Sequence, residues 1–130
     1  MIGFVIVTHR SIGKAMLGTV ETILKEKPNF RLVEVESEAL SMETQHQIKE
    51  AIQSFPLAQG VILLTDLFGA TPCNFCKEFL EFGKVEMITG CNLPMLIKAA
   101  TMDFKESPSQ AAQFLKEYGK ENIRVYSTDF

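Results

Sequence analysis

The sequence has no apolar stretch as long as the roughly 18 residues that a membrane-spanning helix needs. The first apolar run is not preceded by the basic segment of a secretory signal, so export is not expected. There are only three cysteines, an odd number, which favours free thiols over a disulfide framework. These three absences predict a protein of the cytoplasm.

Basic residues are also in the minority. The chain has 13 lysines and arginines against 16 aspartates and glutamates, a formal net charge of −3 at pH 7. Domains that bind nucleic acid usually present a basic surface, so we exclude nucleic acid as a partner. The 130 residues contain no repeat, low-complexity tract or linker, and this length suits one domain with a substantial core. We therefore expect residues 1–130 to form a single domain.

Strand-like and helix-like segments alternate along the whole chain. Short apolar or alternating runs predict strands at residues 2–8, 31–36, 60–66, 84–89 and 122–127. Capping residues followed by apolar residues at helical spacing predict helices that begin near Ser11, Ser41, Thr71, Asn92 and Ser107. These helices are expected to end near Lys25, Phe55, Gly83, Met102 and Gly119. The alternation specifies an α/β fold: a doubly wound, mostly parallel sheet in the order 2-1-3-4 with helices on both faces.

Two ionisable residues follow the strands at the centre of this sheet. His9 comes directly after the first strand and Asp66 ends the third, in loops that diverge around a crevice in the predicted order. The two side chains are therefore expected to face each other, with the loop at residues 90–94 along the same crevice. A carboxylate that accepts a hydrogen bond from one imidazole nitrogen fixes the tautomer and leaves the other nitrogen free to attack.

A loop that suits an anion lies between Asp66 and the next helix. Gly69-Ala70-Thr71 leads into a helix amino terminus, where backbone N–H groups and the helix dipole favour a phosphate. Together with His9 and Asp66, this loop predicts transient phosphorylation of the histidine.

Three segments of the sequence match a known family. Val7-Thr8-His9, the run Leu64-Thr-Asp-Leu-Phe-Gly-Ala-Thr-Pro-Cys-Asn74 and the run Thr89-Gly-Cys-Asn-Leu-Pro-Met95 lie in order at the ends of predicted strands. Together they resemble the enzyme IIA component of the mannose-type bacterial phosphotransferase system. The resemblance extends over nearly the whole chain.

The resemblance implies a phosphotransferase that works without a cofactor or a metal. His9 would take a phosphoryl group from the phosphocarrier HPr and pass it to a IIB partner, which acts with the membrane components IIC and IID in sugar uptake. Asp66 would hold the imidazole, while Thr71 with the neighbouring Gly69 and Ala70 would contact the phosphoryl oxygens. The family is commonly dimeric, with the last strand, here residues 122–127, exchanged between subunits.

The sequence departs from the family pattern at three positions. Arg10 stands where a glycine usually follows the active histidine, and it either steadies a phosphoryl group, alters partner docking or is a solvated charge. Ala70 and Thr71 replace the second glycine and the serine of the usual Gly-Gly-Ser-Pro, but they keep a small side chain and a hydroxyl.

Other functions stay open at this point. Cys73 and Cys76 form a Cys-x-x-Cys pair at a helix start, as in thiol-disulfide oxidoreductases, although their place on the apolar stripe of the helix favours burial. A zinc site that combines them with Cys91 and His9 has suitable ligand types but only one pair at ligand spacing. A regulatory phosphoprotein would use the same His9 chemistry as a transport component. His46, on a polar helix face, is expected to be a surface residue.

Overall fold

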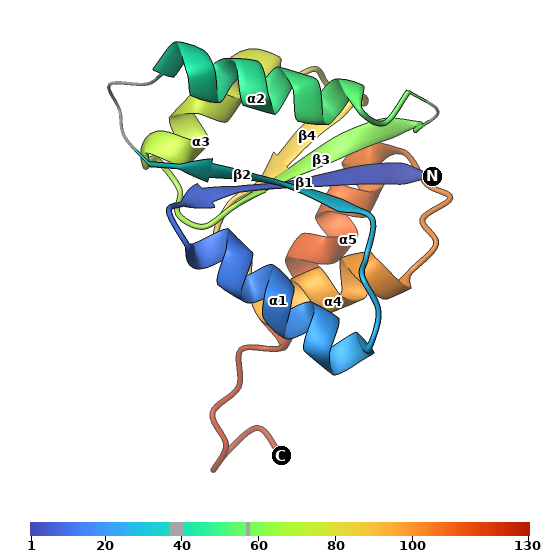
Figure 1. Cartoon of the computed structure of the whole chain (residues 1–130). Coiled ribbons are helices and arrows are strands. Elements are labelled where there is room, and N and C mark those ends of the chain that lie inside the picture. Colours follow the sequence, from blue (N-terminus) through green and yellow to red (C-terminus); the bar gives the residue numbers. More distant parts are fainter. Residues whose placement is uncertain (37–40, 57) are drawn as a thin grey trace.

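The computed structural model describes every residue except 37–40 and 57. Along the chain, strands and helices alternate as the sequence predicts (Figure 1). The elements in chain order are β1 (Ile2–His9), α1 (Ile12–Leu24), β2 (Phe30–Val35), α2 (Ser41–Gln53), β3 (Gly60–Thr65), α3 (Thr71–Cys76), the 3-10 turn η2 (Lys77–Phe79), β4 (Val85–Ile88), α4 (Leu93–Thr101) and α5 (Pro108–Glu121). None of the helices in these described ranges is long and apolar enough to cross a membrane.

The strands form one parallel sheet in the order β2-β1-β3-β4, which confirms the predicted topology. β1 lies at the centre because its seven residues from Ile2 to Thr8 are uncharged and buried on both faces, as central parallel strands are. Its last residue, His9, is in register with Val35 of β2, and Val7 is in register with Thr65 of β3. The carboxyl ends of these three strands therefore meet at one edge of the sheet.

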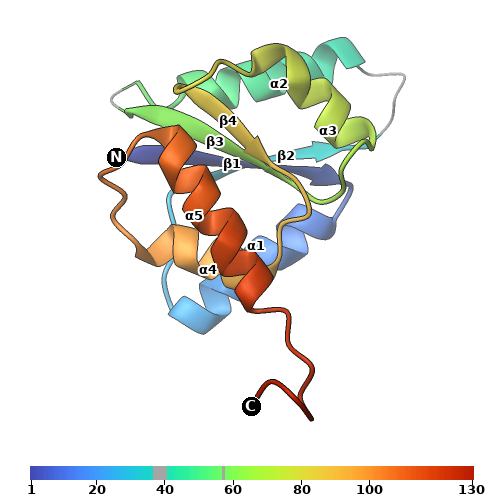
Figure 2. The ribbon, with the colours of Figure 1, turned by 180° about the vertical axis from the view of Figure 1, so that it is seen from behind.

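Helices cover both faces of the sheet. α1, α4 and α5 lie on one face and α2 and α3 on the other, as Figure 2 shows from behind. Side chains along β1 and β3 alternate between two cores because successive residues of a strand point to opposite faces. Phe4, Ile6 and Leu64 belong to the core of α1, α4 and α5. Val5 and Leu63 belong to the core on the side of α2.

Two helix starts are capped by the predicted side chains. The Asn92 side chain accepts a hydrogen bond from the Met95 amide, 3.0 Å away, at the start of α4. Ser107 and Gln110 form a reciprocal capping box at the start of α5. These contacts satisfy amide groups that the first helical turn leaves without a partner in the helix.

Two other helix starts differ from the predicted capping. Ser11 occupies the N-cap position of α1, as predicted, but it adopts a left-handed conformation, with φ 72°, and its side chain makes no capping bond. Ala70 is the residue before α3, so Thr71 is the first residue of that helix instead of its cap. Both errors arise because a capping residue type is recognisable in sequence, whereas the backbone conformation that lets it cap is not.

The ends of two helices also differ from prediction. α3 ends at Cys76 and is followed by η2, well before Gly83. α5 continues through Gly119 to Glu121, and the glycine lies against the start of α4. A Cβ atom on Gly119 would lie 2.8 Å from the Met95 side chain, and its carbonyl oxygen accepts a hydrogen bond from Asn92 Nδ2 at 3.0 Å.

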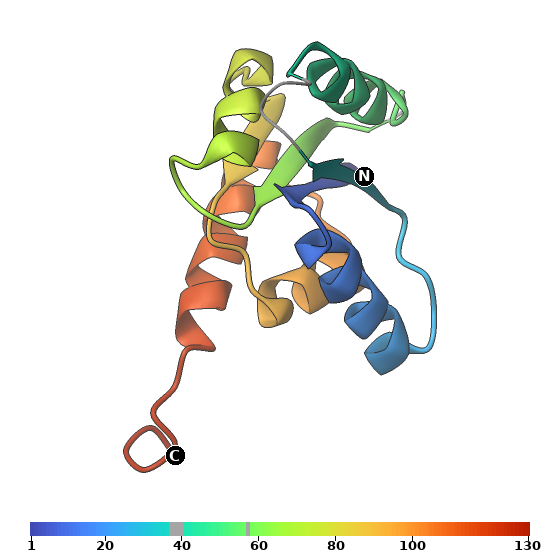
Figure 3. The same ribbon diagram turned by 60° about the vertical axis from the view of Figure 1, so that its left-hand side comes forward.

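The predicted strand at 122–127 does not form within the single chain. Residues 122–130 leave the end of α5 and extend away from the sheet and helices (Figures 1–3). Ile123, Val125 and Tyr126 are exposed in this tail. A strand needs a neighbour for its backbone hydrogen bonds, and α5 directs the tail away from the sheet of its own chain.

α1 approaches β1 closely at Gly13. The Gly13 amide donates a hydrogen bond to Thr8 Oγ1 at 2.7 Å. A Cβ atom on Gly13 would lie 2.7 Å from that oxygen and 2.9 Å from both the Ile6 and Leu32 side chains. The first turn of α1 can therefore reach the end of β1 only without a side chain at this position.

This close approach predicts opposite effects for the same substitution at two glycines of α1. Gly13→Ala should lower the free energy of unfolding by about 1–3 kcal/mol, because the added methyl group forces apart a packed contact. Gly18→Ala, where nothing lies within 4 Å of the new Cβ, should raise it by up to about 1 kcal/mol through helix propensity. Urea unfolding measures both, and equal effects would contradict the tight contact at Gly13.

Candidate active site around His9

The structure brings His9 and Asp66 together at the carboxyl edge of the sheet, as the sequence reasoning expected. His9 Nδ1 lies 2.7 Å from Asp66 Oδ2. The same carboxylate oxygen accepts a hydrogen bond from the His9 backbone amide at 3.1 Å. Asp66 thus fixes both the ring and the main chain of the histidine through one oxygen atom.

The two side chains differ sharply in exposure. The Asp66 side chain is 11% exposed, whereas that of His9 is 43% exposed. A carboxylate only accepts hydrogen bonds, so the neutral imidazole in this contact carries its proton on Nδ1. Nε2, on the other side of the ring from Asp66, then holds a lone pair. The arrangement is that of a nucleophile with its orienting group buried behind it.

Thr8 supports the histidine from inside the fold. Its hydroxyl donates to the His9 carbonyl oxygen at 2.9 Å and accepts from the Gly13 amide at 2.7 Å. The Thr8 side chain is fully buried; the bond to Gly13 is buried and the bond to His9 is partly buried. The sequence analysis gave Thr8 no separate role, although a hydroxyl at the end of an otherwise apolar buried strand was the available signal.

The loop after β4 borders the site, as predicted. The Cys91 amide donates to the Thr65 carbonyl oxygen at 3.0 Å, which ties this loop to the residue before Asp66. Burial raises the pKa of Cys91 to about 11, and the negative charge of Asp66 contributes to the shift. Cys91 therefore remains a neutral thiol beside the carboxylate at neutral pH. Sequence reasoning included it only in the loop and in a zinc alternative.

The loop from Asp66 to α3 holds the predicted phosphate-binding residues. Gly69 adopts φ 78°, which glycine tolerates far better than other residues, and it is exposed. The Gly69 carbonyl oxygen accepts a hydrogen bond from Asn74 Nδ2 at 3.3 Å, and the Ala70 carbonyl oxygen accepts one from the Asn74 amide at 3.0 Å. Thr71 is half-buried at the start of α3. The loop is thus held in place on the exposed edge that follows Asp66.

Arg10 lies on the opposite side of the histidine, toward β2. Its amide donates to the Val35 carbonyl oxygen at 3.1 Å, extending the β1–β2 pairing by one residue. Its Nε lies 3.8 Å from Glu36 Oε1, with both side chains largely exposed.

The structure does not favour a thiol oxidoreductase or a zinc site. Cys73 and Cys76 are both 0% exposed in α3. Burial, reinforced by the neighbouring Cys73, raises the pKa of Cys76 to about 12, so its thiolate is suppressed at neutral pH. Among the described residues, no three or more histidine, cysteine, aspartate or glutamate side chains form a group that could hold a metal ion.

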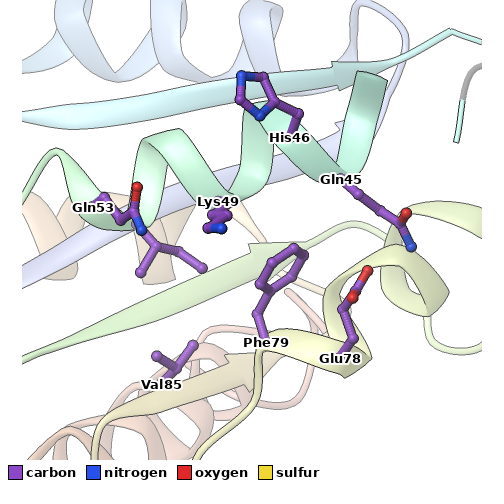
Figure 4. A pocket seen from close by; sticks show the side chains of 8 residues that line it. Gln45, His46, Lys49, Gln53, Glu78, Phe79 and Val85 are labelled. Atoms are coloured by element: carbon purple, nitrogen blue, oxygen red, sulfur yellow. The ribbon is translucent and has the colours of Figure 1, made fainter. Parts of the chain in front are cut away.

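A separate cavity lies away from His9, between α2 and the segment from η2 to β4 (Figure 4). Its volume is about 440 Å³, with Lys49 and Gln53 on the helix side and Phe79 and Val85 opposite. His46 lies at its border, is 67% exposed, and its Nε2 is 2.7 Å from Glu50. The structure therefore places His46 on the surface, as predicted.

The Asp66 contact predicts the tautomer of His9. In the wild-type protein the neutral ring should carry its proton on Nδ1, and Asp66→Ala should shift a substantial fraction of the proton to Nε2. Long-range ¹H–¹⁵N NMR distinguishes the two nitrogens. His46 is the internal control, since its contact with Glu50 does not change. An unchanged His9 spectrum in Asp66→Ala would contradict the orienting role of the carboxylate.

Sequence comparison connects this site with a known family. The family model described as the PTS system fructose IIA component matches residues 3–116. A curated relative, the PTS system fructose-specific EIIA component of Bacillus subtilis (strain 168), is 27% identical over 84 residues. These residues are 64% of this chain and 58% of that protein, so the match spans less than two thirds of the relative's length.

Solved structures share the fold. The mannose/sorbose specific IIA subunit of the phosphotransferase system from Enterococcus faecalis superposes with a TM-score of 0.83 at 22% identity, over 95% of this chain and 92% of that one. The phosphotransferase system component EIIA from Streptococcus agalactiae gives 0.85 at 22% identity, over 98% and 99%. With the family model matching nearly the whole sheet and its helices, the chain belongs to the mannose-type family of IIA components of the sugar phosphotransferase system.

Proposed function

We propose that this protein is a phosphocarrier that accepts a phosphoryl group on His9 Nε2 from phosphorylated HPr and passes it to a IIB partner. The observation that carries the proposal is the 2.7 Å contact between His9 Nδ1 and the Asp66 carboxylate, which is 11% exposed, on a ring that is 43% exposed. A nucleophile for a protein-bound phosphoryl group must be both oriented and reachable, and this histidine is both.

The transfer requires no proton to leave the site. The Nε2 lone pair forms the new N–P bond while the N–P bond of the donor histidine breaks, and that electron pair returns to the donor nitrogen. The His9 ring gains the positive charge that the donor ring loses. Asp66 stabilises this charge through the N–H group that already contacts it. Attack by a nucleophile of the IIB partner then repeats the exchange in the outward direction.

The phosphoryl oxygens need their own partners. We assign this role to the Gly69-Ala70-Thr71 loop on one side of His9 and to Arg10 on the other. The exposed loop offers backbone and hydroxyl groups, and the guanidinium group offers a charged fork that suits phosphate geometry. In this proposal, residues 1–130 act as one IIA unit in the cytoplasm, and sugar uptake occurs through the membrane components IIC and IID that follow IIB. A regulatory protein would use the same transfer step.

Phosphorylation with phosphoenolpyruvate, enzyme I and HPr should place one acid-labile phosphate on each chain. Mass spectrometry under alkaline conditions should locate the phosphate on His9, because this ring is both held by Asp66 and exposed. His9→Ala should abolish the label.

His46→Ala is the matched control, since His46 is also exposed and also contacts a carboxylate but lies away from the sheet edge. It should label like the wild-type protein. No label with HPr from the source organism, or label on another residue, would refute the phosphocarrier proposal.

We also propose a homodimer in which each tail pairs with the other subunit. β4 is an edge strand of the described sheet. Glu81 pairs with the backbone of Val85 at the start of its outer side, and no strand of the described sheet lies beside the rest of that side. The tail supplies apolar residues that its own chain leaves exposed, with Ile123 at 74% and Tyr126 at 86%. An extended segment added to an open edge gains backbone hydrogen bonds and covers apolar surface.

The dimer proposal predicts a mass of twice 14.6 kDa by light scattering at micromolar concentration. Removing residues 122–130 should give a monomer, because the donated strand is lost. Circular dichroism should show an unchanged fold, as the tail packs on neither core of its own chain. A wild-type monomer, or a dimer that persists after truncation, would argue against the exchange.

A further inference from the structure

We propose that Glu36 is a positioning residue. Its carboxylate holds the Arg10 side chain until a phosphoryl group on His9 replaces Glu36 as the partner of that arginine. This inference rests on the proposed phosphocarrier function and deepens it. It concerns a residue that follows β2 and to which the sequence analysis gave no role. The ion pair between Arg10 Nε and Glu36 Oε1, at 3.8 Å, is the observation from which it starts.

Backbone pairing places the two residues together. His9 is in register with Val35, and the Arg10 amide donates to the Val35 carbonyl oxygen at 3.1 Å. Arg10 and Glu36 are therefore the residues that directly follow the two neighbouring strands β1 and β2. The backbone pairing fixes the main chains up to this point, so the Arg10 side chain branches from the residue next to the histidine, and Glu36 is the side chain that it contacts.

The ion pair between Arg10 and Glu36 is weak. The Arg10 side chain is 72% exposed and that of Glu36 is 58% exposed. At 3.8 Å the contact is long for a charge-assisted hydrogen bond, and exposed pairs of this kind are weak. Glu36 thus restricts the conformations of the Arg10 side chain but binds it only weakly.

A phosphoryl group on Nε2 competes with Glu36 on favourable terms. It carries close to two negative charges and three acceptor oxygens, whereas the carboxylate carries one charge and two. A guanidinium group binds phosphate through two parallel N–H···O bonds. Arg10 follows His9 directly in the chain, so its side chain branches from the residue next to the phosphorylated one. The arginine would then stabilise the phosphorylated state and return to Glu36 after transfer.

The test measures the equilibrium of phosphoryl transfer between phosphorylated HPr and this protein. Glu36→Gln removes the carboxylate that competes for Arg10. It should raise the equilibrium constant for phosphoryl transfer to this protein by about two- to fivefold, the range expected for loss of one exposed ion pair. Arg10→Gly should lower it. Glu36→Gln added to Arg10→Gly should change nothing further, because Glu36 acts only through the arginine. Arg10→Lys should restore part of the loss, since an ammonium group lacks the planar fork.

A matched control is available on the same surface. Glu81 pairs with Lys84 at 3.4 Å with similar exposure, so Glu81→Gln removes the same charge away from His9. It should leave the transfer equilibrium unchanged. The ¹⁵Nε resonance of Arg10, identified by its loss in Arg10→Gly, should move on phosphorylation of the wild-type protein.

The outcomes separate the two proposals. No phosphorylation of the wild-type protein would refute the phosphocarrier function itself. Normal phosphorylation with a stationary Arg10 resonance, or with equal transfer constants for Glu36→Gln and Glu81→Gln, would overturn the role of Glu36 alone. An effect of Glu36→Gln that persists in the absence of Arg10 would also overturn it.

Discussion

The hydrogen bond from His9 Nδ1 to Asp66 Oδ2 is the contact on which the rest of the site depends. Through it, one buried carboxylate oxygen sets the direction of the ring, selects its tautomer and holds the neighbouring amide. It acts strongly because the carboxylate is shielded from water while the imidazole is not. In the proposed phosphocarrier, the same exposure difference separates the group that orients the ring from the ring that a partner protein would reach.

The parallel sheet makes this contact possible between residues 57 positions apart. β1 and β3 are neighbours at the centre, and both end at the same edge because they run in the same direction. The loops that follow them turn to opposite faces, so the edge stays open between α1 and α3. Chemistry that needs two oriented side chains and room for a partner is well served by this geometry.

Sequence patterns predicted the sheet order and the pairing of His9 with Asp66, because both depend on apolar periodicity and on rules of chain connection. The patterns failed where the local structure depends on backbone conformation or on packing that the sequence does not reveal. Ser11 and Thr71 have capping side chains, but the backbone at Ser11 is left-handed and Thr71 is already inside its helix. Gly119 reads as a helix end, yet it lies within α5, where it packs against Met95. The segment 122–127 reads as a strand, but α5 carries it away from the sheet of its own chain.

Thr8 shows how narrow the choice of residue can be at a buried position. Its single hydroxyl proton goes to the His9 carbonyl oxygen and one of its lone pairs receives the Gly13 amide. Valine would keep the shape but remove the partner of the buried Gly13 amide and of the partly buried His9 carbonyl oxygen. Serine would keep both bonds and lose the methyl group that stiffens the side chain. The first turn of α1 and the main chain of His9 are thus joined through one hydroxyl group. A shift of α1 along the sheet would therefore also displace the main chain of His9, through the two hydrogen bonds of Thr8.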